Sequence, residues 1–280
     1  MKSASPSAKL QGKLALVTGA GSGIGRATAL LFARTGADLA LCDVDETGLL
    51  AVAAEARALG RTVIARRVDV ANRDQMRDFA AEVHGAHAAV DVLVNNAGVG
   101  LGATFLDTTL EDWDWVISIN LFGVIHGCHF FIPRMVEKGR GGQVVNLSSA
   151  AGFFASSTLA GYSTTKFGVF GLSEALREEL KPHRIGVSTI CPGIIDTPIA
   201  RTTRMRGPSA DPAFHDKVVA FYKKRNYGPD KVAAAILDAV LRNRAVVPVT
   251  PEAWALYLMK RVSPGVAAGI WQKLAARFGR

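Results

Sequence analysis

The stretch "LALVTGAGSGIGRATALLFARTG", from Leu14 to Gly36, decides the fold of this chain. A short apolar run leads into a glycine-rich turn, and a helical pattern follows directly. Glycine permits a tight turn and close approach of the backbone to a ligand, and a helix N-terminus offers free N–H groups and a partial positive charge. The stretch therefore predicts a pyrophosphate-binding loop in preference to a turn without a ligand. Its expected contacts are Thr18, Gly19, Gly21, Ser22, Gly23, Ile24 and Gly25.

Short apolar runs alternate with longer helical patterns through much of the chain. After the first, at residues 14–18, five more follow at residues 38–42, 62–67, 90–95, 143–148 and 185–191. Continuous apolar strands separated by helices predict an α/β fold with a parallel sheet covered on both faces. Because such sheets bind ligands beyond the carboxyl ends of their strands, we expect the functional residues at those ends.

Length and composition predict a single domain. At 280 residues, 49% of them hydrophobic, the chain can bury a full core of the larger α/β kind. We expect a flexible segment at residues 1–10, a main domain at 11–250 with a variable substrate loop at 194–228, and a C-terminal extension at 251–280.

Charge and cysteine content argue against several classes of protein. The chain has 33 basic and 24 acidic residues, a formal charge of +9, but no nucleic-acid-binding motif accompanies this excess. Three separated cysteines fit neither a disulfide framework nor a metal site, and six histidines form no ligand cluster, so we expect buried thiols and no metal.

No signal-peptide pattern and no run of ~18 apolar residues is evident, which predicts a cytoplasmic protein, at most peripheral to a membrane.

Asp43 ends the second apolar run, roughly twenty residues after the glycine-rich loop. A carboxylate there accepts hydrogen bonds from both ribose hydroxyls of adenosine and repels a 2′-phosphate. Ser22 is not basic, and Arg66 and Arg67 lie a whole strand away. The alternative role for Asp43 is a cap for the helix expected near residues 45–59. Because the carboxylate would repel a 2′-phosphate and no basic residue is expected beside it, we expect NAD as the cofactor.

Tyr162 and Lys166 stand four residues apart at the start of a helical pattern, "GYSTTKFGVFGLSEALREELK". On a helix this spacing puts both side chains on one face. A positive charge beside a phenol lowers its pKa from about 10 and makes it a usable acid or base. Taken alone the pair is a common amphipathic pattern, so other motifs must decide its role.

Four motifs together closely resemble the classical short-chain dehydrogenases/reductases. They are the TGxxxGxG loop at 18–25, the Asn-Asn-Ala-Gly run at 95–98, Ser149 thirteen residues before Tyr162, and the YxxxK pair itself. The likeness covers roughly residues 10–250. It implies one Rossmann-like domain with a doubly wound seven-stranded parallel sheet, and hydride transfer between nicotinamide C4 and an alcohol or carbonyl carbon.

The resemblance also implies roles for individual residues. Tyr162 matches the catalytic acid/base, and Lys166 the residue that lowers its pKa and holds the nicotinamide ribose. Ser149 matches the hydroxyl that holds the substrate oxygen, with Ser148 as its neighbour. Asn120 matches the anchor of a water-mediated proton relay, with a helix kink as its alternative role. The further cofactor contacts so implied are Asp69, Val70, Asn95, Ala97, Gly98, Pro192, Gly193, Ile195 and Thr197.

The expected substrate pocket is apolar, which predicts a lipophilic secondary alcohol or ketone. Core packing is the alternative for each of its side chains. The pocket residues implied by the family are Val99, Leu101, Ser149, Phe153, Phe154, Tyr162, Ile199 and Met205, with Phe221 and Tyr222 nearby in the variable region.

Assembly and the extension stay open at this point. By analogy a homodimer or homotetramer is expected, joined through helices near residues 112–135 and 162–180. The extension carries aromatic and basic residues at helical spacing, so it packs on the active site or a subunit, or contacts a membrane. Its deletion is expected to leave the sheet intact.

An NAD-dependent alcohol dehydrogenase or ketoreductase is the leading expectation for the function. The alternatives are an NADP-dependent ketoreductase, a catalytically silent protein that senses dinucleotides, and an enzyme of this fold that catalyses dehydration or epimerisation.

Overall fold

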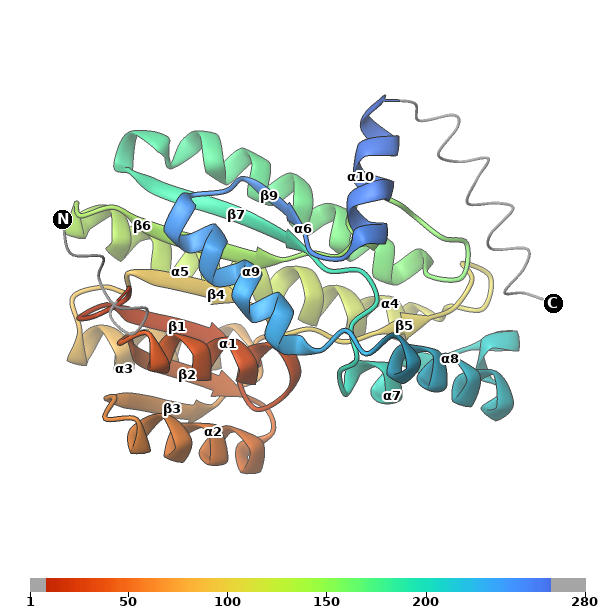
Figure 1. Cartoon of the computed structure of the whole chain (residues 1–280), viewed down its shortest axis with the longest axis horizontal. Helices are drawn as coiled ribbons and strands as arrows, with labels where there is room; N and C mark the ends of the chain where they lie inside the picture. Colours follow the sequence, from red (N-terminus) through yellow and green to blue (C-terminus); the bar gives the residue numbers. More distant parts are fainter. Residues whose placement is uncertain (1–8, 263–280) are drawn as a thin grey trace.

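A parallel sheet of seven strands forms the centre of the protein. The structure, a computed structural model, describes residues 9–262. The strand order is β3-β2-β1-β4-β6-β7-β9, and it reverses between β1 and β4 (Figure 1). The expected doubly wound, seven-stranded Rossmann-like fold is confirmed. The strands are β1 Leu14–Thr18, β2 Asp38–Asp43, β3 Val63–Arg67, β4 Val92–Asn95, β6 Gly142–Leu147, β7 Ile185–Cys191 and β9 Val246–Pro248.

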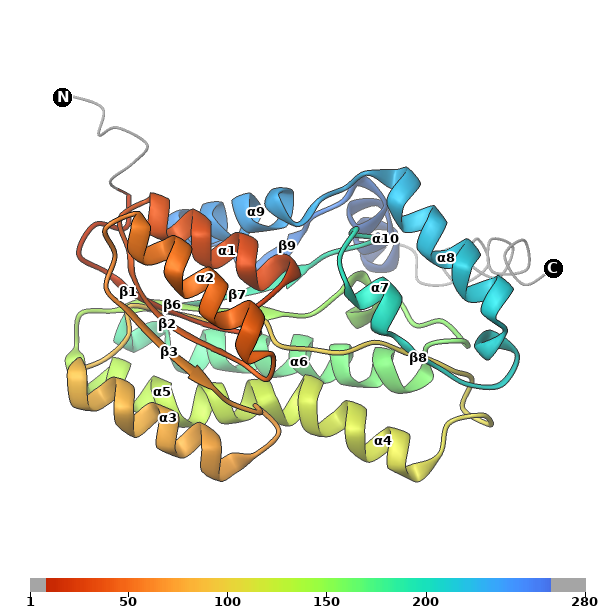
Figure 2. The same cartoon turned by 90° about the horizontal axis from the view of Figure 1, so that it is seen from below.

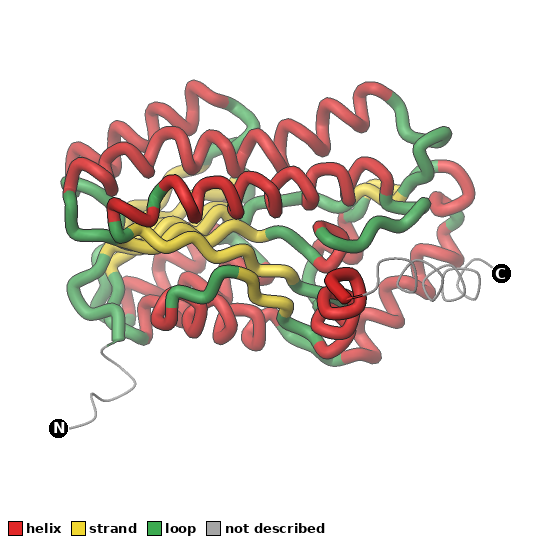
Figure 3. The backbone as a smooth tube through the Cα atoms, turned by 90° about the horizontal axis from the view of Figure 1, so that it is seen from above, coloured by secondary structure: helices red, strands yellow, loops and turns green. Residues whose placement is uncertain are grey.

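Helices cover both faces of this sheet. α1, α2 and α9 lie on one face, and α3, α5 and α6 lie on the other (Figures 2 and 3). Successive residues of a strand point to opposite faces, so β1 sends Ala15 and Val17 into one core and Leu14 and Leu16 into the other. This explains why its sequence is apolar throughout. The helices are α1 Gly23–Arg34, α2 Glu46–Ala58, α3 Arg73–Ala86, α5 Gly123–Lys138, α6 Ala160–Glu179 and α9 Pro229–Arg242.

Shorter elements gather beyond the carboxyl ends of the strands. β5 Leu101–Gly102 pairs in parallel with β8 Arg204–Met205, so the chain after β4 lies beside the chain that follows β7. Further helices follow β6 and β7, and α7 and α8 lie near β8 (Figure 2). They are η3 Ala150–Gly152, α7 Ile199–Thr202, η5 Gly207–Ala210 and α8 Pro212–Arg225.

One long helical stretch, Leu110–Lys138, runs along the outer layer. It joins α4 Leu110–Ile117, the π-helical turn η2 Ser118–Phe122, and α5. By length and composition it could cross a membrane. Half of its apolar window is buried inside the protein, and a core helix meets the same criterion.

The first part of the C-terminal extension packs against the domain. α10 Pro251–Val262 buries Ala253 completely, and the Tyr257 ring meets Phe153 edge to face at 5.4 Å between centroids. Deletion from residue 251 would therefore uncover Phe153, and the expectation that the sheet survives this deletion stays a prediction; residues 263–280 of the extension lie outside the described residues.

Candidate active site

The glycine-rich loop between β1 and α1 has a backbone that glycine adopts most readily. Gly19 and Gly23 have φ values of +64° and +52°. A Cβ atom on Gly25 would overlap the carbonyl oxygen of Gly19. No acidic residue lies in the first turn of α1, so the partial positive charge of this helix N-terminus is available to an anion.

The same loop is tied to the end of β4. The Thr18 hydroxyl accepts hydrogen bonds from the N–H groups of Asn96 (3.0 Å) and Ala97 (3.1 Å). The Asn96 amide donates to the carbonyl oxygens of Thr18 (2.9 Å) and Gly19 (3.0 Å). The sequence prediction missed this role of Asn96, although the doubled asparagine was a signal for it.

Asn95 has a different environment from Asn96. Its side chain is buried and donates to Asn146 Oδ1 at 2.9 Å and to the Cys128 sulfur at 3.4 Å, which ties β4 to β6 and α5. These contacts stabilise the central strands, and the expected contact of Asn95 with the cofactor stays a prediction.

Asp43 lies against the glycine-rich loop. Its Oδ2 accepts from the Gly21 N–H at 2.7 Å, and its Oδ1 from the Asp45 N–H at 2.9 Å. Asp45 is the residue that caps α2, because its side chain accepts from the Gly48 N–H. The Asp43 carboxylate thus lies at the carboxyl end of β2, directly beside the glycine-rich loop.

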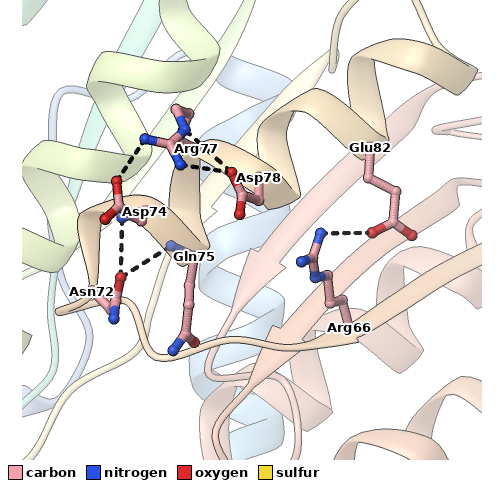
Figure 4. Close-up of polar contacts among 7 residues, drawn as sticks. All are labelled: Arg66, Asn72, Asp74, Gln75, Arg77, Asp78 and Glu82. Atoms are coloured by element: carbon pink, nitrogen blue, oxygen red, sulfur yellow. Dashed lines mark hydrogen bonds and ion pairs between the residues drawn. The ribbon is translucent and has the colours of Figure 1, made fainter.

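The two arginines at the end of β3 behave differently. Arg66 pairs with Glu82 of α3 at 3.2 Å, and Asn72 caps the N-terminus of that helix (Figure 4). Arg67 is the register partner of Asp43, and its Nε donates to the Val44 carbonyl oxygen at 3.2 Å. The expectation that Arg67 is remote from Asp43 is wrong, because adjacent strands of a sheet lie only ~4.8 Å apart.

The catalytic candidates come together beyond β6. Ser149 follows this strand and hydrogen-bonds Tyr162 on the first turn of α6. Lys166, one turn further on, is buried and donates from Nζ to the Leu147 carbonyl oxygen at 2.9 Å. Its Nζ lies 5.7 Å from the centroid of the Tyr162 ring. Ser148 donates to the Lys166 carbonyl oxygen at 2.8 Å, so its hydroxyl is engaged inside the protein.

Burial dominates the protonation of this group. Desolvation raises the pKa of Tyr162 to about 12, although the hydrogen bond with Ser149 opposes the shift. Desolvation also lowers the pKa of Lys166 to about 8. Loss of water around the phenol is the largest cause of its shift, and the expected lowering of the Tyr162 pKa by Lys166 stays a prediction.

Asn120 lies in the π-helical turn between α4 and α5. Its Oδ1 accepts from the Val99 N–H at 2.8 Å, and its Nδ2 donates to the Val99 carbonyl oxygen at 2.9 Å and to the Thr165 hydroxyl at 3.3 Å. π-Helical turns inside α-helices are frequent at functional sites. The structure shows the irregular turn, and the proton relay stays a prediction.

The remaining cofactor candidates follow the carboxyl ends of β3 and β7. The Val70 carbonyl oxygen accepts from His126 Nδ1 at 2.8 Å, so that ring nitrogen carries the proton. Asp69 Oδ1 accepts from the Ala71 N–H at 2.9 Å. After β7, the Pro192 carbonyl oxygen accepts from the Ala150 N–H at 2.8 Å, and Ile195 is buried.

Three glycines also lie where neighbouring side chains approach closely. A Cβ on Gly98 would be 3.1 Å from Asn120 Oδ1, and one on Gly193 would overlap Thr250 Oγ1. Thr197 is buried and lies against Gly23 of the glycine-rich loop, because a Cβ on that glycine would be 3.5 Å from Thr197 Cβ. Thr197 therefore faces the glycine-rich loop.

Five of the predicted pocket residues belong to two separate apolar clusters. Val99, Leu101 and Tyr162 belong to one apolar cluster. Phe153 and Phe154 are buried in another, with Ala253 of α10, which favours the core-packing alternative for these two. Met205 lies over Gly102, where a Cβ would overlap its sulfur, and Ile199 begins α7.

Comparison with known proteins agrees with this geometry. The family model described as short chain dehydrogenase matches residues 13–206. The chain belongs to the short-chain dehydrogenase/reductase family. Within residues 9–262, no group of three or more His, Cys, Asp or Glu side chains could hold a metal ion.

Three similar proteins illustrate the extent of the match. The "Probable oxidoreductase EphD" of Mycobacterium tuberculosis is 44% identical over 255 residues, which are 90% of this chain but only 43% of EphD. The C alpha-dehydrogenase of a Sphingobium species is 33% identical over 249 residues, covering 86% of this chain and 82% of that one. A short-chain dehydrogenase/reductase from Burkholderia phymatum, solved with NAD, has a TM-score of 0.83 at 32% identity and covers 90% of this chain and 94% of that chain.

Proposed function

We propose that this protein is an NAD-dependent oxidoreductase that transfers hydride between nicotinamide and a lipophilic secondary alcohol or ketone. The observation that carries the proposal is the group of half-buried Ser149 and Tyr162 with buried Lys166, which lies beyond the carboxyl end of β6. Reduction of a carbonyl group requires a proton donor, a hydrogen-bond donor to the oxygen and a bound hydride source, and these residues supply the first two.

Tyr162 is the residue that we propose to move the proton. Bound NADH supplies hydride from nicotinamide C4, and NAD⁺ accepts it in the reverse direction. The Tyr162 phenol donates its proton to the carbonyl oxygen, which the Ser149 hydroxyl holds in place. A pKa raised to about 12 keeps the phenol protonated at neutral pH, which favours reduction. Alcohol oxidation needs the phenolate and therefore gains from higher pH.

The residues around the site are proposed to divide the dinucleotide among them. The loop at 18–25 would hold the pyrophosphate, Asp43 the adenosine ribose, and Asp69 with Val70 the adenine. Residues 95–98 would lie beside the nicotinamide ribose that Lys166 binds, and residues 192–197 beside the carboxamide. Asn120 would anchor the proton relay.

NAD is favoured over NADP by the position of Asp43. Its carboxylate lies beside the loop and would repel a 2′-phosphate. An NADP-dependent ketoreductase is the second candidate, and the observation in its favour is the Arg67 guanidinium at the Val44 carbonyl oxygen, next to Asp43. Arginine at this edge of the sheet is a usual partner of the 2′-phosphate. The preference for NAD or NADP therefore depends on whether the adenosine ribose lies closer to the Asp43 carboxylate or to the Arg67 guanidinium.

Assembly and location complete the proposal. We propose a homodimer or homotetramer in the cytoplasm, with residues 11–250 as the catalytic domain and 194–228 as its variable substrate loop. A peripheral membrane contact through residues 251–280 agrees with the exposed side chains of Trp254 (42%) and Leu258 (55%) on α10.

A panel of secondary alcohols and ketones of increasing chain length tests the proposal, with each compound supplied with NAD(H) or NADP(H) and absorbance of the reduced nicotinamide followed. We expect turnover to favour long apolar compounds and NAD(H) over NADP(H) by at least about tenfold in kcat/KM. Equal or faster turnover with NADP(H) would assign the ribose site to Arg67. No turnover of any compound with either cofactor would favour a dinucleotide-binding protein without this activity.

A further inference from the structure

A buried carboxylate on α4 holds two arginines from a distant part of the chain. Asp112 is 1% exposed, and its Oδ1 accepts from Arg204 at 2.7 Å. Arg206 donates from Nε to Oδ2 at 2.7 Å and from a terminal nitrogen to Oδ1 at 2.9 Å. The three charge-assisted hydrogen bonds hold the pKa of Asp112 well below its usual range, so it stays ionised across the working pH range.

Both arginines belong to residues 199–207, which we call the cover segment. It comprises α7, β8 and the first residue of η5. Backbone N–H groups of Arg204 and Arg206 donate to the carbonyl oxygens of Gly100 and Gly102, both at 3.0 Å. The Arg204 guanidinium also lies 3.8 Å from the centroid of the Trp115 ring on α4. The cover segment is thus fixed to the chain after β4 and to α4.

Glycines allow this close approach. A Cβ on Gly100 would overlap the Thr203 hydroxyl, and one on Gly102 would overlap the Met205 sulfur. Gly207, with φ of +57°, lies against the Asp107 carboxylate, where a Cβ has no room. The segment therefore packs backbone to backbone over β5, whose Leu101 shares an apolar cluster with Tyr162.

The two ends of the cover segment lead to the cofactor loop and to a lightly packed helix. Thr197 and Pro198, just before it, lie against Gly23 of the glycine-rich loop. α8, just after it, has no fully buried residue, and its Tyr222 is near enough to Tyr162 to add to the rise in that phenol's pKa. The buried carboxylate of Asp112 therefore holds the cover segment in a part of the protein where that segment and α8 have few buried side chains of their own.

We propose that Asp112 is a positioning residue that holds the cover segment over the substrate and nicotinamide, and so sets substrate affinity and the rate of nucleotide release. The proposal rests on the proposed function for its substrate readout. The physical reason is that loss of one partner of a buried, hydrogen-bonded charge pair mainly raises the rate at which the two joined segments separate. Release of such covering segments often limits turnover in enzymes that enclose their substrates.

Two variants and a matched control test this inference. Asp112→Asn keeps the shape of the side chain and removes its charge. Arg206→Gln removes two of the three hydrogen bonds from a side chain that is 42% exposed, so it remains informative if the first variant does not fold. Asp114→Asn is the control, because Asp114 is an exposed carboxylate on the same helix. Arg206→Lys tests rescue of the charge.

Three measurements separate positioning from simple stabilisation. In both variants we expect NADH to dissociate about tenfold faster in stopped-flow fluorescence and KM for the ketone to rise about tenfold with a smaller change in kcat. Trypsin should cleave after Arg204 faster in both variants than in the wild type. The control should match the wild type, and Arg206→Lys should recover part of the loss.

A lower melting temperature with unchanged NADH release, KM and cleavage rate would overturn the inference and leave Asp112 a purely stabilising residue. The trypsin arm needs neither substrate nor cofactor. If the wild type turns over no ketone, the proposed function fails, yet the cleavage rates and NADH release still decide whether Asp112 holds the cover segment.

Discussion

Replacing Tyr162 with phenylalanine is expected to lower kcat at least about 100-fold while changing the dissociation constant of NADH by less than about threefold. The substitution removes only the phenolic oxygen, which carries the transferred proton and the hydrogen bond with Ser149. The ring itself remains in the apolar cluster with Val99 and Leu101. Steady-state kinetics with the best substrate of the panel, together with a fluorescence titration of NADH, measure both quantities.

Tyr227→Phe is the matched control for this experiment. The Tyr227 hydroxyl donates to the Val249 carbonyl oxygen at 2.8 Å, away from Ser149 and Lys166. Its loss should reduce stability slightly and leave kcat near that of the wild type. If Tyr162→Phe retained wild-type turnover, Tyr162 would not be the proton donor, and another acid would have to be sought around Ser149.

The second large effect is expected from Gly25→Ala. The new Cβ would overlap the carbonyl oxygen of Gly19 and lie 2.6 Å from the Asn96 amide nitrogen, so the loop must move. That movement breaks the contact between the loop and the end of β4, and with it the arrangement of N–H groups that a pyrophosphate requires. We expect NADH binding at least about 100-fold weaker and a lower melting temperature.

Gly85→Ala in α3 provides the comparison. Nothing lies within 4 Å of a Cβ at this position, and alanine favours a helix over glycine. This variant should bind NADH normally and melt at the same or a higher temperature. Normal NADH affinity in Gly25→Ala as well would show that the glycine-rich loop is not the pyrophosphate site.

Sequence patterns were sufficient to predict the fold, and the assigned roles of the site residues stay predictions. The run from Leu14 to Gly36 predicted strand, loop and helix because each depends on neighbouring residues only. Tyr162 and Lys166 share one helix face for the same reason. The strand boundaries of β1 and β7 match the predicted ones, and others differ by one or two residues.

Features that depend on tertiary packing could not be read from the sequence. The pairing of Asp112 with Arg204 joins residues 92 positions apart, and no local pattern connects them. The position of Arg67 beside Asp43 follows from the register of β2 with β3. The direction of the pKa shift of Tyr162 depends on the surrounding burial, which spacing to Lys166 does not report.

Transfer of deuterium from NADH labelled at nicotinamide C4 to a lipophilic ketone tests the central claim most directly. The two labelled diastereomers are supplied separately with the ketone that performs best in the panel, and the alcohol is analysed by mass spectrometry. We predict that one diastereomer yields alcohol with one deuterium on the carbinol carbon, and that Tyr162→Phe forms it at least about 100-fold more slowly. Alcohol without the label from both diastereomers, or no alcohol from any ketone of the panel, would contradict the account of this protein as a hydride-transferring oxidoreductase.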